Sequence, residues 1–250
     1  MPNESATAAQ VGNHRATLLE AVILHHRDYR ETSLLLEAFS AEQGRLSLLA
    51  KGAKRGRNAG SHTLQAFVPL RLSWTGRGEL PVLTAAETNG DAISLNGTAL
   101  YCGFYMNELL LRLLPPHDPY PEIFQLYLDS LRRLAVTGQY EQVLRGFEVG
   151  LLEHIGYGLS LEQEAGSGHP IDPDQTYEYL IDQGPVATHH PGANSIHGST
   201  LLGLRRDNLD NPGARLEAKR LMRRVIDHYL DGRALKSRDL FKQLGKARTA

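Results

Sequence analysis

Short runs of branched and aromatic residues, separated by polar or glycine-containing segments, fill the chain between residues 17 and 86. This pattern is typical of β-strands. The predicted strands cover residues 18–24, 33–39, 45–51, 67–74 and 80–85. Pro69 within the fourth run indicates an edge strand or a bulge, because proline has no N–H group to donate to a ladder. Five short strands in a segment of this length favour a small closed barrel of the OB type.

A helical spacing replaces the strand pattern after residue 96. Apolar residues then recur every three or four positions, which is typical of helices with one buried face. Pro115 and Pro116 end the first predicted helix, and Gly156 is placed to cap the third. The predicted helical segments cover residues 100–114, 121–135 and 140–155, then 201–232, with a restart after Ser237 as an N-cap.

The two patterns together predict an α+β fold with a small insert in its helical part. The stretch 158–200 is rich in Gly, Pro, His and acidic residues, and we expect it to be irregular, with one hairpin around 177–181 and 186–188. The expected divisions are a tail at 1–14, an OB-fold DNA-binding domain at 15–88, the first part of a helical domain at 97–157, the insert at 158–200 and the C-terminal part of the helical domain at 201–250.

Composition excludes several classes of protein. Cys102 is the only cysteine, so an intramolecular disulfide and a cysteine-rich zinc module are excluded. The chain contains no apolar run long enough for a membrane span, and its first fifteen residues lack the apolar stretch of a signal peptide. We therefore expect a soluble, cytoplasmic protein without membrane partners.

Charges are sorted into blocks, although the formal net charge is only −1. Residues 43–78 contain seven Lys or Arg and no acid, whereas residues 146–204 contain eight acids and no Lys or Arg. From residue 212 onward, eleven basic residues face four acids. Such blocks create fields of opposite sign, and the basic ones are candidate surfaces for a polyanion, with an ordinary solvated surface as the alternative.

The strongest functional feature is the sequence KGAKRGR at residues 51–57, which opens into a glycine-rich loop. Glycine lets a backbone follow a phosphate chain closely, and the cations supply charge that is blind to base sequence. The loop lacks the spacing and the Lys-Ser/Thr pair of a P-loop, so nucleotide hydrolysis is not expected. Trp74 beside Arg71 either stacks on bases or belongs to the barrel core or to a hinge against the helical domain. The candidate DNA-binding residues of this region are Lys51, Lys54, Arg55, Arg57, Arg71, Trp74 and Arg77.

A second basic surface is expected on the C-terminal helix. Helical spacing places Lys219, Arg220, Arg223 and Arg224 on one face, opposite Leu221. This face either extends a DNA track from the barrel or keeps a surface helix soluble. We include Lys219, Arg220 and Arg223 among the candidate DNA-binding residues.

Enzymatic and metal chemistry find little support in the sequence. No nucleophile motif, dinucleotide loop or cysteine pair is present. Five histidines in or near the insert raise the alternative of a metal-dependent nuclease, but their spacing fits no common metal site. We therefore expect no enzyme, no cofactor and no metal. The histidines concerned are His154, His169, His189, His190 and His197.

Several sequence elements occur in the order and spacing of one known family, and the chain resembles the RecO family of DNA-repair proteins. The elements are AVILHHRDYRETSLLLEAFSAEQGR at 21–45, Lys51-Gly52-Ala53, Leu100-Tyr101, Asn107-Glu108-Leu109, the segment 154–158, and Leu235-Lys236-Ser237-Arg238. The resemblance implies an OB-fold, a helical bundle and a zinc-finger-like insert. Because this insert has no cysteines, we do not expect the zinc that some family members hold there.

The resemblance also implies partners. It implies a recombination mediator that binds single- and double-stranded DNA, anneals complementary strands, contacts the acidic C-terminal tail of single-strand-binding protein, and with RecR helps to load RecA. Family members seat the tail in a hydrophobic, basic pocket of the helical domain. Here that pocket would draw on Arg112, Arg132, Arg133 or Arg145. An OB-fold adaptor that binds only proteins is the alternative.

Overall fold

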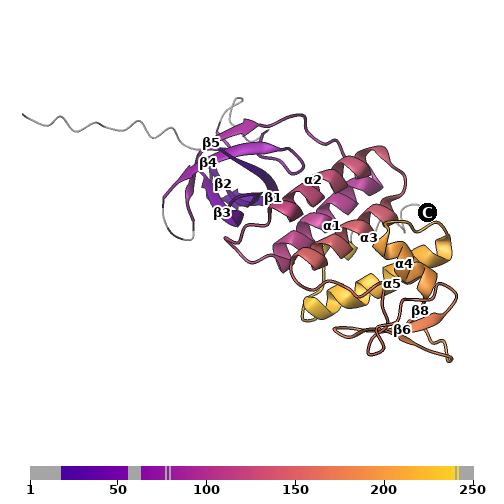
Figure 1. Ribbon diagram of the computed structural model, residues 1–250. Helices are drawn as coiled ribbons and strands as arrows, with labels where there is room; N and C mark the ends of the chain where they lie inside the picture. Colours follow the sequence, from indigo (N-terminus) through magenta and orange to yellow (C-terminus); the bar gives the residue numbers. More distant parts are fainter. Residues whose placement is uncertain (1–17, 56–62, 77, 79, 240, 242–250) are drawn as a thin grey trace, which may run out of the picture.

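Figure 1 shows a computed structural model with a β-barrel at one end, helices in the middle and a small sheet at the other end. The structure describes residues 18–55, 63–76, 78, 80–239 and 241. The barrel closes in the order β1-β2-β3-β5-β4, which confirms the predicted OB-type barrel. Its strands are β1 (Leu19–Tyr29), β2 (Ser33–Ser40), β3 (Gly44–Ala50), β4 (Leu70–Thr75) and β5 (Val82–Thr88).

Alternating side chains fill the barrel interior. In β3 the burial alternates residue by residue, with Leu46 and Leu48 inside and Arg45 and Ser47 less buried. Gly44 at the start of β3 has a φ of 66°, and a Cβ there would lie 2.0 Å from the carbonyl oxygen of Asp118. Only glycine therefore lets the β2–β3 turn rest against the loop that follows the first helix.

Strand β1 is longer than predicted, because its second half is held by pairing rather than by an apolar pattern. The prediction ended at residue 24, whereas β1 continues to Tyr29 through polar residues that pair with β2. A register shift between Ile23 and His25 accompanies this change. Pro69 immediately precedes β4, so it costs that strand no hydrogen bond.

The helical core consists of α1 (Thr98–Leu113), α2 (Pro121–Val136) and α3 (Tyr140–His154), with α5 (Pro212–Tyr229) packed beside them. The buried residues of α2 and α3 include the apolar positions that the helical spacing of the sequence indicates. The barrel residues Val22, Leu24 and Phe39 belong to the same buried cluster as these helices. One buried cluster therefore crosses the boundary between barrel and helices, while the barrel interior forms a separate cluster.

Asn107 on α1 adds a polar link inside this core. Its amide nitrogen donates to the carbonyl oxygen of Leu24 in the barrel at 2.8 Å, and its amide oxygen accepts from the hydroxyl of Tyr127 on α2 at 2.6 Å. Asn107 is 2% exposed and Tyr127 is fully buried. A buried amide with both groups satisfied fixes the orientation of α1 against the barrel.

Asn107→Ala is expected to lower the free energy of unfolding by about 2 kcal/mol, because each buried group left without its partner costs about 1–3 kcal/mol. Urea unfolding monitored by circular dichroism measures this loss. The control Asn96→Ala removes an exposed amide from the same region and should change stability by less than about 0.5 kcal/mol. Equal losses in the two variants would contradict the role given to Asn107.

The insert is more ordered than its composition indicates. The expected hairpin is present as β6 (Thr176–Leu180) and β7 (Gly184–Ala187), and a third strand that the sequence did not reveal, β8 (Ser195–His197), pairs with the other edge of β6. Helix α4 (Gly198–Arg205) follows directly, three residues earlier than the apolar pattern indicates. Tyr177 and Ile196 are buried in a cluster with residues of α5, and this packing holds strands too short to be recognised by periodicity.

Candidate functional site

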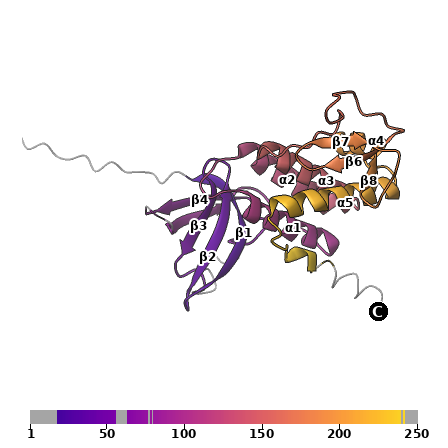
Figure 2. The same cartoon turned by 90° about the horizontal axis from the view of Figure 1, so that it is seen from below.

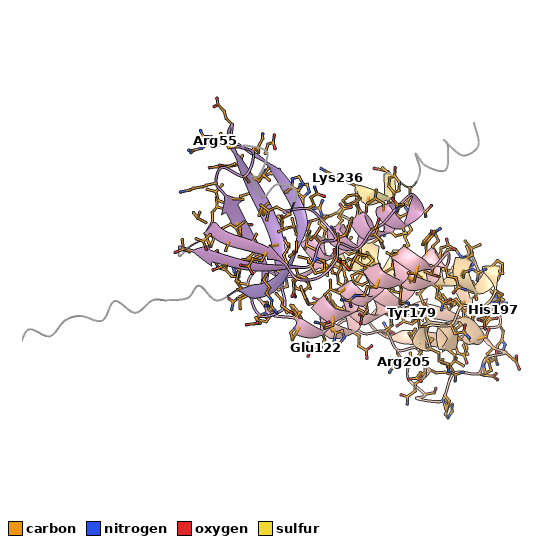
Figure 3. The ribbon with its side chains drawn as sticks, turned by 90° about the horizontal axis from the view of Figure 1, so that it is seen from above. Arg55, Glu122, Tyr179, His197, Arg205 and Lys236 are labelled. Atoms are coloured by element: carbon orange, nitrogen blue, oxygen red, sulfur yellow. The ribbon has the colours of Figure 1, made fainter. Side chains whose placement is uncertain are left out.

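Exposed cations gather at one end of the barrel. Lys51, Lys54 and Arg55 follow β3 and are exposed, and Figure 3 shows Arg55 at the barrel, far from Arg205 and His197 at the other end of the molecule. The ammonium group of Lys54 donates to Oδ2 of Asp28 at 2.6 Å, so one carboxylate partly neutralises it. We call Lys51, Lys54 and Arg55 the barrel-tip cations. The predicted residues Arg57 and Arg77 lie outside the described residues.

Two further cations that the sequence reasoning missed lie on the neighbouring β1–β2 hairpin. Arg27 and Arg30 are exposed, and the guanidinium carbon of Arg30 lies 5.4 Å from the centre of the Tyr29 ring. The acids Asp28 and Glu31 alternate with these arginines along the chain, so the segment is not an acid-free basic block in the sequence. The hydrogen bond from Lys54 to Asp28 brings this hairpin to the barrel-tip cations.

Arg71 and Trp74 on β4 are less suited to DNA than the sequence indicated. Arg71 is exposed, but its strand neighbours in register are Glu20 on β1 and Glu87 on β5. Two carboxylates in these positions reduce the positive potential around Arg71. Trp74 is half-buried and packs against the barrel core.

A cavity of about 690 Å³ lies in the helical part of the molecule, between α1, α3, α5 and the residues that follow α5. Figure 1 shows α5 between α3 and the insert strands β6 and β8. Cys102, Leu144 and Phe241 are among its apolar lining residues. Burial raises the pKa of the Cys102 thiol to about 12, so it remains protonated and serves as an apolar wall. The charged lining residues are Glu141, Arg145, Glu148, Arg215, Lys219, Arg223 and Arg238.

A buried ion pair lies at the inner wall of this cavity. Arg145 is 7% exposed and Glu148 is 1% exposed, and a guanidinium N–H of Arg145 donates to Oε1 of Glu148. The hydroxyl of Tyr105 donates to the same oxygen at 2.6 Å. Burial and the neighbouring Glu148 carboxylate raise the pKa of Tyr105, so the phenol remains a donor. Among the described residues, neither Nε of Arg145 nor Oε2 of Glu148 has a hydrogen-bond partner.

Cations of α5 and of the segment after it surround the cavity. Lys219 pairs with Glu141 at 2.8 Å across the gap between α5 and α3, and Arg223 lies 3.8 Å from Asp227. Arg238 donates to the same carboxylate, that of Asp227. The sequence made Lys219 and Arg223 candidates for a DNA track, with a soluble helix face as the alternative, and in the structure both line this cavity. Arg220 is exposed on the same helix but does not line the cavity.

Of the four arginines expected to receive an acidic tail, the structure places only Arg145 at the cavity. Arg112 lies 3.7 Å from Glu108 on its own helix, and Arg132 and Arg133 pair with Asp129 and Asp207 at 2.7 Å. None of these three lines the cavity.

The histidines do not form a metal site in the part of the chain that the structure describes, where no group of three or more His, Cys, Asp or Glu side chains could hold an ion. His197 instead bonds Oε1 of Glu217 on α5 at 2.7 Å, while Oε2 accepts from the hydroxyl of Thr200 at 2.8 Å. These bonds fasten β8 and α4 to α5. No helix within the described ranges is both long enough and apolar enough to span a membrane.

Comparisons with known proteins cover both parts of the chain. The family model described as "Recombination protein O N terminal" matches residues 16–90, and the one described as "Recombination protein O C terminal" matches residues 94–239. The protein named "DNA repair protein RecO" of Methylococcus capsulatus is 56% identical over 228 residues, which cover 91% of this chain and 94% of that protein. The protein of the same name from Nitrosococcus oceani is 47% identical over 232 residues, with coverages of 92% and 94%. This chain therefore belongs to the RecO family.

Proposed function

We propose that this protein is a non-enzymatic recombination mediator in DNA repair, which binds single- and double-stranded DNA with its barrel and the acidic C-terminal tail of single-strand-binding protein with its helical domain. The observation that carries the proposal is the presence of two basic sites of different shape on separate parts of one molecule. One is an exposed group of cations at a barrel tip, and the other is a cavity with a buried arginine.

The barrel tip suits a polyanion. Phosphate contacts require accessible cations rather than a shaped pocket, and the barrel-tip cations together with Arg27 and Arg30 are exposed. Such contacts are insensitive to base sequence, which is what a protein acting at any gap or end requires.

The cavity suits a short acidic peptide that ends in an apolar residue. Its apolar walls can bury one such side chain, while Lys219 and Arg215 at its border can pair with carboxylates. Arg145 also lines the cavity, and its Nε–H group has no hydrogen-bond partner among the described residues. A duplex has no narrow terminus of this kind, so the cavity favours a protein tail over DNA.

The presence of both sites on one molecule gives a way to remodel DNA that is covered by single-strand-binding protein. Capture of the tail raises the local concentration of the barrel tip near the DNA that the partner covers. By family membership, the same proposal extends to annealing of complementary strands, to RecR as a partner, to RecA loading as the downstream step, and to the cytoplasm, at the nucleoid, as the place of action.

Fluorescence anisotropy of a labelled single-stranded oligonucleotide over a salt series tests the proposal, with the unlabelled tail peptide as competitor. A steep fall of log affinity with log salt, together with separate binding of the peptide, is expected. Absence of DNA binding with retained peptide binding would favour an OB-fold adaptor that binds only proteins.

Glu141→Gln is expected to strengthen binding of the tail peptide about twofold to fivefold. In the free protein the carboxylate of Glu141 pairs with Lys219, so the peptide must break this ion pair to reach the lysine. An exposed ion pair of this kind contributes about 0.2–1 kcal/mol of free energy. Titration of the labelled peptide at low salt measures the change. In a Lys219→Ala background the gain should be smaller, because only the removal of the Glu141 charge from the cavity lining then remains. An equal gain there would contradict competition for Lys219.

A further inference from the structure

The chain reverses direction after α5 and returns beside α1. Asp231 and Gly232 have positive φ values of 49° and 71°, and Figure 2 shows the residues that follow running back along α1. We call residues 233–239 and 241 the C-terminal segment. Its Leu235 is 2% exposed and lies in the same apolar cluster as the residues of α1, α2 and α3.

This segment supplies one wall of the cavity. Arg238 and Phe241 are both lining residues. The ring of Phe241 lies 6.2 Å from that of Tyr101 and 6.4 Å from that of Tyr105, centre to centre. The wall therefore exists only while the C-terminal segment lies on α1.

One carboxylate on α1 holds the segment in place. Oε1 of Glu108 accepts the backbone N–H of Lys236 at 3.0 Å, and Oε2 accepts the backbone N–H of Ser237 at 2.8 Å. Burial acts to raise the pKa of Glu108, but the hydrogen bonds from Ser237 and Lys236 and the charge of Arg112 together hold the pKa below its usual value. The ionised carboxylate thus gives each oxygen to one N–H group. Glu108 itself does not line the cavity.

We propose that Glu108 is a positioning residue for partner binding, which builds the cavity wall formed by Arg238 and Phe241 by fastening Lys236 and Ser237 to α1. The inference rests on the proposed tail-binding function. Without this fastening the segment is docked for only part of the time, and the apparent affinity of the cavity falls in proportion to the docked fraction. Glu108 would thus control the affinity of the cavity although it does not line the cavity itself.

The first test compares the full-length wild type with Glu108→Gln, which keeps one acceptor oxygen, and Glu108→Ala, which keeps none. Hydrogen exchange of the Lys236 and Ser237 amides reports the fastening directly. Titration of the labelled tail peptide reports the cavity. We expect amide protection and peptide affinity to fall in the order Glu, Gln, Ala, with at least about a fivefold loss of affinity for the alanine variant. DNA binding by the barrel should not change.

A double-mutant cycle separates positioning from general destabilisation. In an Arg238→Ala/Phe241→Ala background the wall is already missing, so Glu108→Ala should change peptide affinity by less than about twofold. The control Arg112→Ala removes the ion pair of Glu108 on α1 and should leave both amide protection and affinity unchanged.

Two results would overturn the inference alone: normal peptide affinity in Glu108→Ala despite faster amide exchange, or an undiminished effect of Glu108→Ala in the wall-less background. A wild-type protein that binds DNA but no tail peptide would overturn the proposed function together with the inference.

Discussion

Reversing Lys54, Arg55 and Arg57 to Glu is expected to weaken binding of single-stranded DNA by at least about a hundredfold at low salt. The substitution changes the charge of the loop by six units, and it places a carboxylate next to Asp28, which now pairs with Lys54. Each lost phosphate contact makes the negative slope of log affinity against log salt less steep by about 0.7, so its magnitude should decrease by about 2. Anisotropy with a labelled oligonucleotide over a salt series measures both quantities, and the tail peptide should bind as before.

A matched control distinguishes the loop from net charge. Arg132, Arg206 and Arg233 are exposed and lie in the helical domain, and their reversal to Glu changes the net charge equally. Exposed charges separated by more than about 10 Å interact weakly at about 0.1 M salt, so at that salt concentration the control should change DNA affinity by less than about threefold. Similar losses in the two triple variants would show that net charge, rather than the barrel tip, governs binding.

The sequence predicted those parts of the fold in which local pattern and burial coincide. The five strands and the stripes of α1–α3 are apolar because they face a core, so spacing alone identifies them. The sequence pattern did not predict the second half of β1, because residues 25–29 are polar and are extended only through their pairing with β2. It also missed β8, whose three residues are held by packing on α5 and by the bonds of Glu217.

The candidate sites divide in the same way. The barrel-tip cations are neighbours along the chain, so their charge is visible in the sequence. The cavity combines residues as distant as Cys102 and Phe241, and its ion pairs depend on which helices face each other. Charge alone could not separate Arg145, buried at the cavity, from Arg132 and Arg133, which pair with acids elsewhere. The Arg145–Glu148 spacing of three residues does not separate them either, because Arg132 and Asp129 have the same spacing on α2.

Arg145→Ala is expected to lower the free energy of unfolding by about 3–5 kcal/mol, because it leaves the buried carboxylate of Glu148 without its cation. Tyr105 alone would then donate to that carboxylate. Urea unfolding followed by both fluorescence and circular dichroism measures the loss and checks that the two transitions coincide. A loss below about 1 kcal/mol would mean that solvent reaches Glu148 and that the pair is not buried in solution.

Replacing the whole cluster separates stability from binding. The triple variant Arg145→Met, Glu148→Leu and Tyr105→Phe removes the charges and the hydroxyl together, so no buried polar side chain of the cluster loses its partner. Buried ion pairs exchanged for apolar residues of similar volume are often neutral or stabilising, so most of the lost stability should return. Affinity for the acidic tail peptide should nevertheless remain at least about tenfold below that of the wild type, because the charge-assisted hydrogen bonds of Arg145 are gone. If stability and affinity both returned, the tail would be held by the other cations of the cavity, on α5 and at Arg238, and the buried pair would serve only the fold.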